Sequence, residues 1–205
     1  MKVLVACEES QAVCIEFRKL GHEAYSNDLQ ECSGGHPEWH LQMDILQAIR
    51  SSKWDLIMMH LPCTAIALCG NSTYGTGMPK NKERIDSIDW TSSMWYYACS
   101  VCDHVGFENP KNVMGKFIGK HTQVIQPYEF GHPERKETWL WLKGLPNLIS
   151  TNNVYDEMMS LPKKERERIH YISPGPERGK IRSKTFPGIA KAIASQWSEY
   201  LTNRL

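Results

Sequence analysis

The chain has 205 residues, of which 41% are hydrophobic and 23% are charged, as is typical of one globular domain with a sizeable core. It contains no run of about 18 apolar residues, which excludes the usual pattern of a membrane-spanning helix. Its net charge of +1 neither indicates nor excludes nucleic acid as a partner. The apolar run that starts the chain is short and soon acidic, so it predicts a first strand and no signal peptide. Seven cysteines without a disulfide-framework spacing predict reduced thiols and a cytoplasmic protein.

Short apolar runs alternate with helical patterns along the chain. Strands are expected, in chain order, over 2–6, 22–28, 54–60, 105–110, 122–130 and 137–144, the last two as a hairpin. Helices are expected over 10–21, 43–49, 84–104 and 186–201. Strands that alternate with helices predict an α/β fold with a single doubly wound, mostly parallel sheet.

Two of the predicted strands end in side chains that can carry out chemistry. Cys63 follows the strand "WDLIMMH", and Glu108 lies at the end of the strand "VGFENP". Because the carboxyl ends of parallel strands meet at one edge of a sheet, the thiol and the carboxylate are expected to lie together. The alternatives are a buried structural thiol for Cys63 and a capping or salt-bridged carboxylate for Glu108.

The pair suits a reaction at cytosine C5, which becomes nucleophilic when a thiolate adds to C6 and an acid protonates N3. Cys63 would need thiolate character, favoured by nearby cations. Glu108 would need a raised pKa to hold its proton, which burial at a strand end can supply.

With these residues in view, the chain resembles the DNA cytosine-5 methyltransferases. "PC" after an apolar strand, "EN" after a later strand and "FGHPERKET" (130–138) follow the order of that family's motifs. The chain also resembles small methyltransferase-like proteins of phages and prophages that lack a target-recognition domain. The resemblance implies one Rossmann-like methyltransferase domain over 1–205, S-adenosylmethionine as cofactor, and DNA or a cytosine nucleotide as substrate.

The same resemblance assigns roles to individual residues. It implies catalytic roles for Cys63, Glu108 and Lys136. It implies a cofactor site formed by Glu8, Asp28, Asp44 and Pro62. From the residues alone, Lys136 can also be a solvated strand lysine, Asp28 a turn residue and Asp44 a helix N-cap.

The chain departs from the family at two places. The segment "CEESQAV" has no glycine, whereas the family has a glycine-rich loop there that lets the backbone approach the cofactor. Only about 35 residues separate "WLWLKG" from "RSKTF", where the family has its target-recognition domain, so a short insertion is expected over about 150–180. Candidate phosphate contacts, with ordinary solvated cations as the alternative, are Lys116, Lys120, Lys180 and Arg182. Binding to single-stranded or duplex DNA is therefore expected to be nearly indifferent to sequence.

Other functions stay open. The protein can use the same thiol addition with another one-carbon donor, bind nucleic acid or a nucleotide without catalysis, or act as a phage decoy that interferes with host methylation. The spacing of Cys32, His36 and His40 invites a metal site, but the glycines and proline between them argue against one, and none is expected. Trp139 and Trp141 alternate in their strand and are expected in the core. The oligomeric state is left open.

Overall fold

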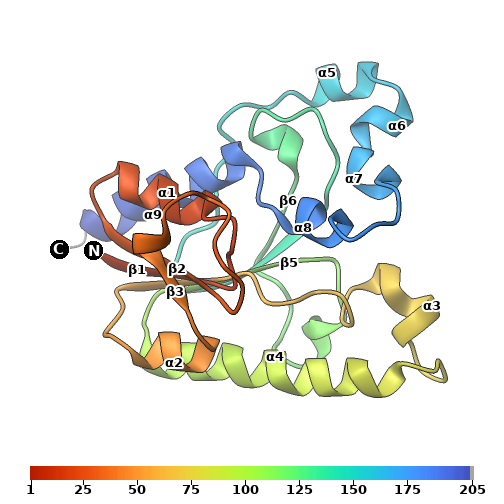
Figure 1. The fold of residues 1–205 in the computed structure, drawn as a ribbon. Helices are drawn as coiled ribbons and strands as arrows, with labels where there is room; N and C mark the ends of the chain where they lie inside the picture. Colours follow the sequence, from red (N-terminus) through yellow and green to blue (C-terminus); the bar gives the residue numbers. More distant parts are fainter. Residues whose placement is uncertain (204–205) are drawn as a thin grey trace.

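The computed structural model describes residues 1–203, and a seven-stranded sheet of order β3-β2-β1-β4-β5-β7-β6 forms its centre (Figure 1). The strands are β1 Lys2–Ala6, β2 Glu23–Asp28, β3 His40–Gln42, β4 Leu56–Met59, β5 Val105–Pro110, β6 Gln123–Ile125 and β7 Thr138–Lys143. The strands from β3 to β5 are parallel, while β7 pairs antiparallel with both β5 and β6. This arrangement confirms the predicted doubly wound, mostly parallel α/β sheet and its hairpin. The three-residue strand β3 was not predicted.

Helices cover both faces of the sheet (Figure 1). One face carries α1 (Ala12–Lys19) and α9 (Pro187–Thr202), and the other carries α2 (Ile45–Arg50) and α4 (Asn81–Val101). Alternate residues of a strand point to opposite faces, so Val3 and Val5 join the core under α1 and α9, while Leu4 and Ala6 join the core over α2 and α4. Trp141 is buried in the second core, as predicted.

Shorter helices flank the carboxyl ends of the parallel strands. Below this edge in Figure 1 lies α3 (Asn71–Tyr74). Above it lie the helices of the expected insertion and its C-terminal border, α5 Tyr155–Ser160, α6 Lys163–Arg166, α7 Arg168–Tyr171 and α8 Arg178–Ser183. Single turns of 3-10 helix are η1 Pro37–Trp39, η2 Leu68–Gly70, η3 Met114–Lys116 and η4 Pro127–Glu129. Within residues 1–203, no helix has both the length and the apolar character needed to cross a bilayer.

Candidate active site

The loops after β4 and β5 are joined by a chain of amide hydrogen bonds that fixes the position of Cys63. The Asn109 side chain donates to the backbone carbonyl of Leu61 at 2.8 Å, and Asn112 donates to the Asn109 side chain at 2.9 Å. Both asparagines are buried. The backbone carbonyl of Cys63 accepts a hydrogen bond from the amide of Ala67 at 2.8 Å, and the chain turns away from the sheet there. The predicted nucleophile thus lies on a rigid turn at the carboxyl edge.

The structure brings the three predicted catalytic residues together. Burial and the charge of Glu108 raise the pKa of the Cys63 thiol, and the charge of Lys136 acts in the opposite direction. Lys136 lies between this edge and the start of α9, with its Nζ 5.9 Å from the centre of the Phe186 ring. Pro62, beside Cys63, is exposed. The thiolate character that the proposed addition would need is thus opposed by burial and by the charge of Glu108 and favoured by the nearby cation Lys136.

Glu108 forms a buried pair with His60, which sequence reasoning did not assign. Nδ1 of His60 lies 3.1 Å from Oε2 of Glu108, and the two side chains are only 9% and 11% exposed. Burial acts to raise the pKa of Glu108, but the hydrogen bond from His60 and the charge of Lys136 outweigh it, so the pKa is lowered. The expectation of a raised pKa for Glu108 is therefore wrong for the free protein.

His60 shows the opposite shift to Glu108. Burial acts to lower the pKa of His60, but the hydrogen bond and charge of Glu108, joined by the charge of Glu8, raise it. Nε2 of His60 is buried and has no hydrogen-bond partner among residues 1–203. Each group of the pair thus favours the charged form of the other, and one ring nitrogen is unused.

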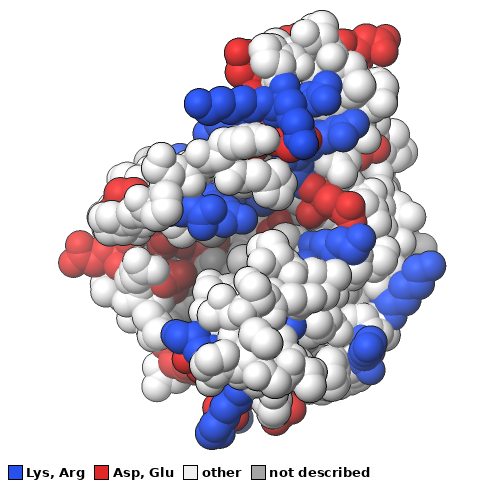
Figure 2. Space-filling model, turned by 90° about the vertical axis from the view of Figure 1, so that its right-hand side faces the viewer, with Lys and Arg blue, Asp and Glu red and all other residues white. Residues whose placement is uncertain are grey.

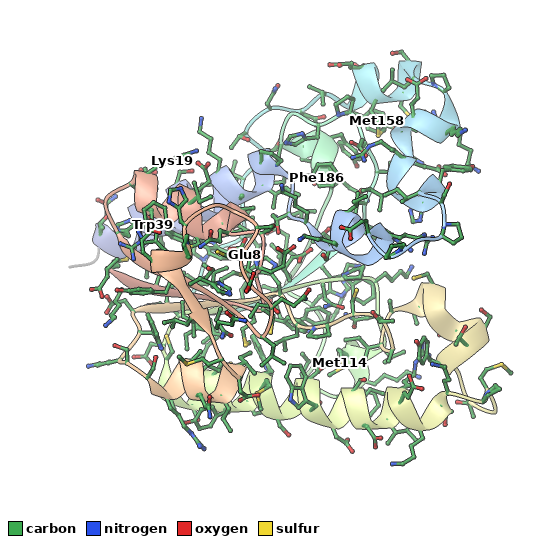
Figure 3. All side chains as sticks on the ribbon, viewed as in Figure 1. Glu8, Lys19, Trp39, Met114, Met158 and Phe186 are labelled. Atoms are coloured by element: carbon green, nitrogen blue, oxygen red, sulfur yellow. The ribbon has the colours of Figure 1, made fainter. Side chains whose placement is uncertain are left out.

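Glu8 lies in the interior of the molecule, beneath α1 (Figure 3). Its carboxylate accepts hydrogen bonds from the backbone amides of Val13 at 2.7 Å and Cys14 at 3.2 Å, in the first turn of α1. It is 4% exposed, and burial raises its pKa. Glu8 therefore accepts hydrogen bonds from amides at the start of α1 that have no partner within the helix. The charges of both Glu8 and Glu108 act on the pKa of His60.

Two residues of the loop between β1 and α1 have a left-handed backbone conformation. Glycine adopts this conformation easily, but neither of the two residues is glycine. Cys7 has φ 58° and Gln11 has φ 57°. The Gln11 side chain donates to the carbonyl of His36 at 2.8 Å and accepts from the amide of His36 at 3.0 Å. Gly34 packs so closely on Gln11 that an added Cβ would lie 2.5 Å from the Gln11 Cβ. These contacts hold the loop in a conformation that glycine would adopt with less strain.

Asp28 and Asp44 lie at neighbouring positions on the carboxyl edge, beside Cys7. Burial, followed by the charges of Asp28 and Asp44, raises the pKa of the Cys7 thiol to about 12. Asp28 ends β2, and Asp44 is the N-cap of α2, accepting from the amide of Leu46 at 2.8 Å. Two carboxylates at adjacent strand ends fit the hydroxyl and amine groups of an adenosine. The carboxylate of Glu8 is already hydrogen-bonded to the backbone amides of α1, so it is not free to accept a hydrogen bond from the cofactor as Asp28 and Asp44 could.

The predicted phosphate contacts lie on two sides of the edge. Lys116 and Lys120 are exposed on the segment after β5, and Lys180 and Arg182 lie on α8, where Lys180 pairs with Glu9 at 3.6 Å. Residues 163–184 contain eight Lys and Arg and three Glu, a net +5 by subtraction, in a chain of net +1. In Figure 2, which faces this edge, basic side chains form a band across the upper part, above a hollow bordered by acidic ones.

Comparisons with protein-family models and with curated proteins found no match. Among solved structures, the chain is similar to a crystal structure described as a proposed DNA modification methyltransferase encoded within a prophage of E. coli. The two share 12% sequence identity with a TM-score of 0.42, over 80% of this chain and 56% of the other. The chain thus spans little more than half the length of that protein. A likeness of this size does not by itself establish a shared function.

Proposed function

We propose that the protein is an S-adenosylmethionine-dependent methyltransferase-like enzyme that acts on C5 of cytosine, in DNA or in a nucleotide, through a covalent bond from Cys63. The observation that carries the proposal is the cluster of Cys63, Glu108 and Lys136 at the carboxyl edge of adjacent parallel strands. A thiol, a carboxyl group and a cation are the groups that addition to C6 and protonation of N3 require.

The chemistry begins with the proton of the His60–Glu108 pair. When N3 of cytosine approaches, a proton passes from Nδ1 of His60 to the Glu108 carboxylate, and the resulting carboxyl group donates a hydrogen bond and then its proton to N3. The loss of negative charge on Glu108 removes the repulsion that opposes ionisation of Cys63, while Lys136 continues to favour the thiolate. The thiol releases its proton to water, Sγ bonds to C6, and the electron pair of the C5–C6 double bond shifts toward C5 as N3 takes its proton, which makes C5 nucleophilic.

S-adenosylmethionine, held through Asp28 and Asp44, supplies an electrophilic methyl group for C5. After C5 is substituted, the proton on C5 passes to water, the C5–C6 double bond re-forms, and the Sγ–C6 bond breaks to release Cys63 as a thiolate. N3 returns its proton to Glu108. In this proposal the exposed Pro62, next to Cys63, belongs to the cofactor site.

The proposal is tested by trapping the covalent intermediate. In 5-fluorocytosine, fluorine replaces the C5 proton, so the final elimination is blocked and the adduct persists. We expect a mass increase on the wild-type protein with fluorinated single-stranded DNA and S-adenosylmethionine, and none on Cys63→Ser. The matched control is Cys69→Ser, because Cys69 lies exposed on the same loop and should trap like the wild type. Equal trapping by Cys63→Ser would overturn the assignment.

The other functions predict different outcomes of the same experiment. Another one-carbon donor predicts an adduct that S-adenosylmethionine does not promote. A catalytically silent nucleic-acid binder or a decoy predicts no adduct with any donor. The buried His60–Glu108 pair supports an enzyme, since taking two charged groups out of water is costly and perturbed titratable pairs cluster at functional sites.

A further inference from the structure

A cavity of about 670 Å³ lies beside the loop that carries Cys63. The Cys63 loop contributes Leu68 and Asn71 to its lining, and the β7 strand contributes Trp139. Trp139 pairs with Asn109 in the sheet, one residue from Glu108, so it points to the opposite face, the face covered by α4. The cavity thus adjoins the proposed active site around the edge of the sheet and is distinct from it.

The cavity is positively charged. Lys116, Lys120 and Arg84 line it, and no carboxylate is among its lining residues in the described part of the chain. Arg84 is 7% exposed, and it donates to the backbone carbonyls of Ala65 at 2.6 Å and Ala67 at 3.0 Å. No ion pair among residues 1–203 includes Arg84, so its charge is not neutralised by the protein. Such a cavity attracts an anion.

An aromatic pair forms one wall. The rings of His121 and Trp139 are stacked, with centroids 4.1 Å apart and planes at 27°. Trp139 is half-buried and packs against the core that α4 covers, whereas Trp141 lies fully inside that core, so the expected core position is met in full by Trp141 and in part by Trp139. A hydrogen bond of 2.7 Å from Trp139 Nε1 to Glu137 fixes the ring. A fixed aromatic wall beside cations is the arrangement on which single-stranded nucleic acid stacks its bases.

We propose that this cavity binds a nucleotide that neighbours the target cytosine in single-stranded DNA, with its base against the Trp139–His121 pair and its phosphate between Lys116 and Lys120. The inference deepens the proposed function, on which it rests, by naming a single-stranded polymer as the substrate class. A base in a duplex is stacked on its neighbours and cannot stack on the Trp139–His121 pair unless it first leaves them. Any base has a face that stacks, so the site selects single strands without selecting sequence.

Arg84 links the cavity to the active site. The same guanidinium that lines the cavity also holds two carbonyls of the loop after Cys63. The cavity and the segment after the proposed nucleophile therefore share one fixed side chain.

The test measures binding of a fluorescein-labelled cytosine dodecamer by anisotropy, with unlabelled duplex and dCMP as competitors. We expect Trp139→Leu to weaken dodecamer binding about 10-fold or more, as loss of one stacked base does. Lys116→Ala/Lys120→Ala should reduce the slope of log K against log salt by about 1.4, or about 0.7 per lost contact. The control Lys53→Ala, at the opposite edge of the sheet, should bind like the wild type. Duplex and dCMP should compete poorly.

Unchanged dodecamer binding by both the tryptophan and the lysine variants would overturn the cavity proposal, as would competition by duplex equal to that by the single strand. If Trp139→Leu does not fold, Trp139→Phe replaces it and should retain binding, because phenylalanine keeps an aromatic face. The salt slope of the lysine variant then decides whether the cavity binds the phosphate. Adduct formation at Cys63 is measured separately. If the wild type forms the adduct but the cavity variants bind DNA as well as the wild type, the cavity proposal alone is refuted. If the wild type forms no adduct but the cavity variants bind DNA more weakly, the proposed reaction alone is refuted.

Discussion

Replacing His60 should reveal how much the buried pair contributes to folding and over which pH range. His60→Leu removes the partner of a carboxylate that is only 11% exposed. Breaking a buried pair costs about 3–5 kcal/mol, and Lys136 remains near Glu108, so we expect a loss at the low end, about 3 kcal/mol. His60→Asn retains an N–H donor near Nδ1. A hydrogen bond to a charged group contributes about 1.5–3 kcal/mol, so the loss should be only about 0–1.5 kcal/mol.

The pH dependence follows from the direction of the two shifts. The pKa of Glu108 is lowered from 4.5, so its contribution is present above pH 4.5 and is lost as the pH falls through its folded pKa. The pKa of His60 is raised from 6.5, so its contribution is present below pH 6.5 and is lost as the pH rises through its folded pKa. The difference in free energy of unfolding between wild type and variant should be largest between pH 4.5 and 6.5.

Urea unfolding followed by tryptophan fluorescence, from pH 4 to 9, measures this difference. The matched control is His104→Asn, because the ring of His104 bonds a backbone carbonyl, that of Asp55, in place of a carboxylate. A His60→Leu loss that is the same at every pH would show that His60 contributes packing alone. That result would also remove the source of the proton in the proposed reaction.

Further changes test the remaining parts of the site. Glu108→Gln should retain its fold and lower turnover about 10²–10⁴-fold in a methyl-transfer assay, because the amide cannot protonate N3; normal turnover would reduce Glu108 to a structural carboxylate. Asp28→Asn should weaken binding of S-adenosylhomocysteine about 10-fold by calorimetry, the loss of one charge-assisted hydrogen bond; unchanged heat would place the nucleoside elsewhere. Arg182→Ala should reduce the salt slope of single-stranded DNA binding by about 0.7, and an unchanged slope would exclude a phosphate contact.

The sheet could be predicted from the sequence because its strands are short apolar runs separated by clear helix patterns. Parallel strands bring their carboxyl ends together whatever their exact length, which is why Cys63 and Glu108 could be expected to meet. The strand β3 was missed because its three residues, His40–Gln42, are partly polar and pair only with β2. So short a strand has no periodicity of its own, and tertiary pairing alone defines it.

The protonation states could not be predicted, since they depend on side chains that the fold brings together. Burial alone would have raised the pKa of Glu108, as expected from its strand position. The opposite result comes from His60, which is 48 residues away in sequence. Glu8 was likewise expected to contact a cofactor, but its carboxylate is bonded to the amides of α1. In each case the orientation of one buried side chain determines the contacts of the carboxylate, and sequence spacing does not encode that orientation.

Burial and the charge of Glu108 act together on Cys63, and both raise the pKa of its thiol. The pKa of Glu108 is itself lowered, because the hydrogen bond from His60 and the charge of Lys136 outweigh burial. In the proposed reaction, a cytosine that takes a proton at N3 draws it from the His60–Glu108 pair and thereby removes the carboxylate charge, while the burial of the thiol remains. Ionisation of Cys63 would then be favoured by the base that it attacks, which would limit adventitious reaction of a partly exposed cysteine, since the thiolate is the reactive form.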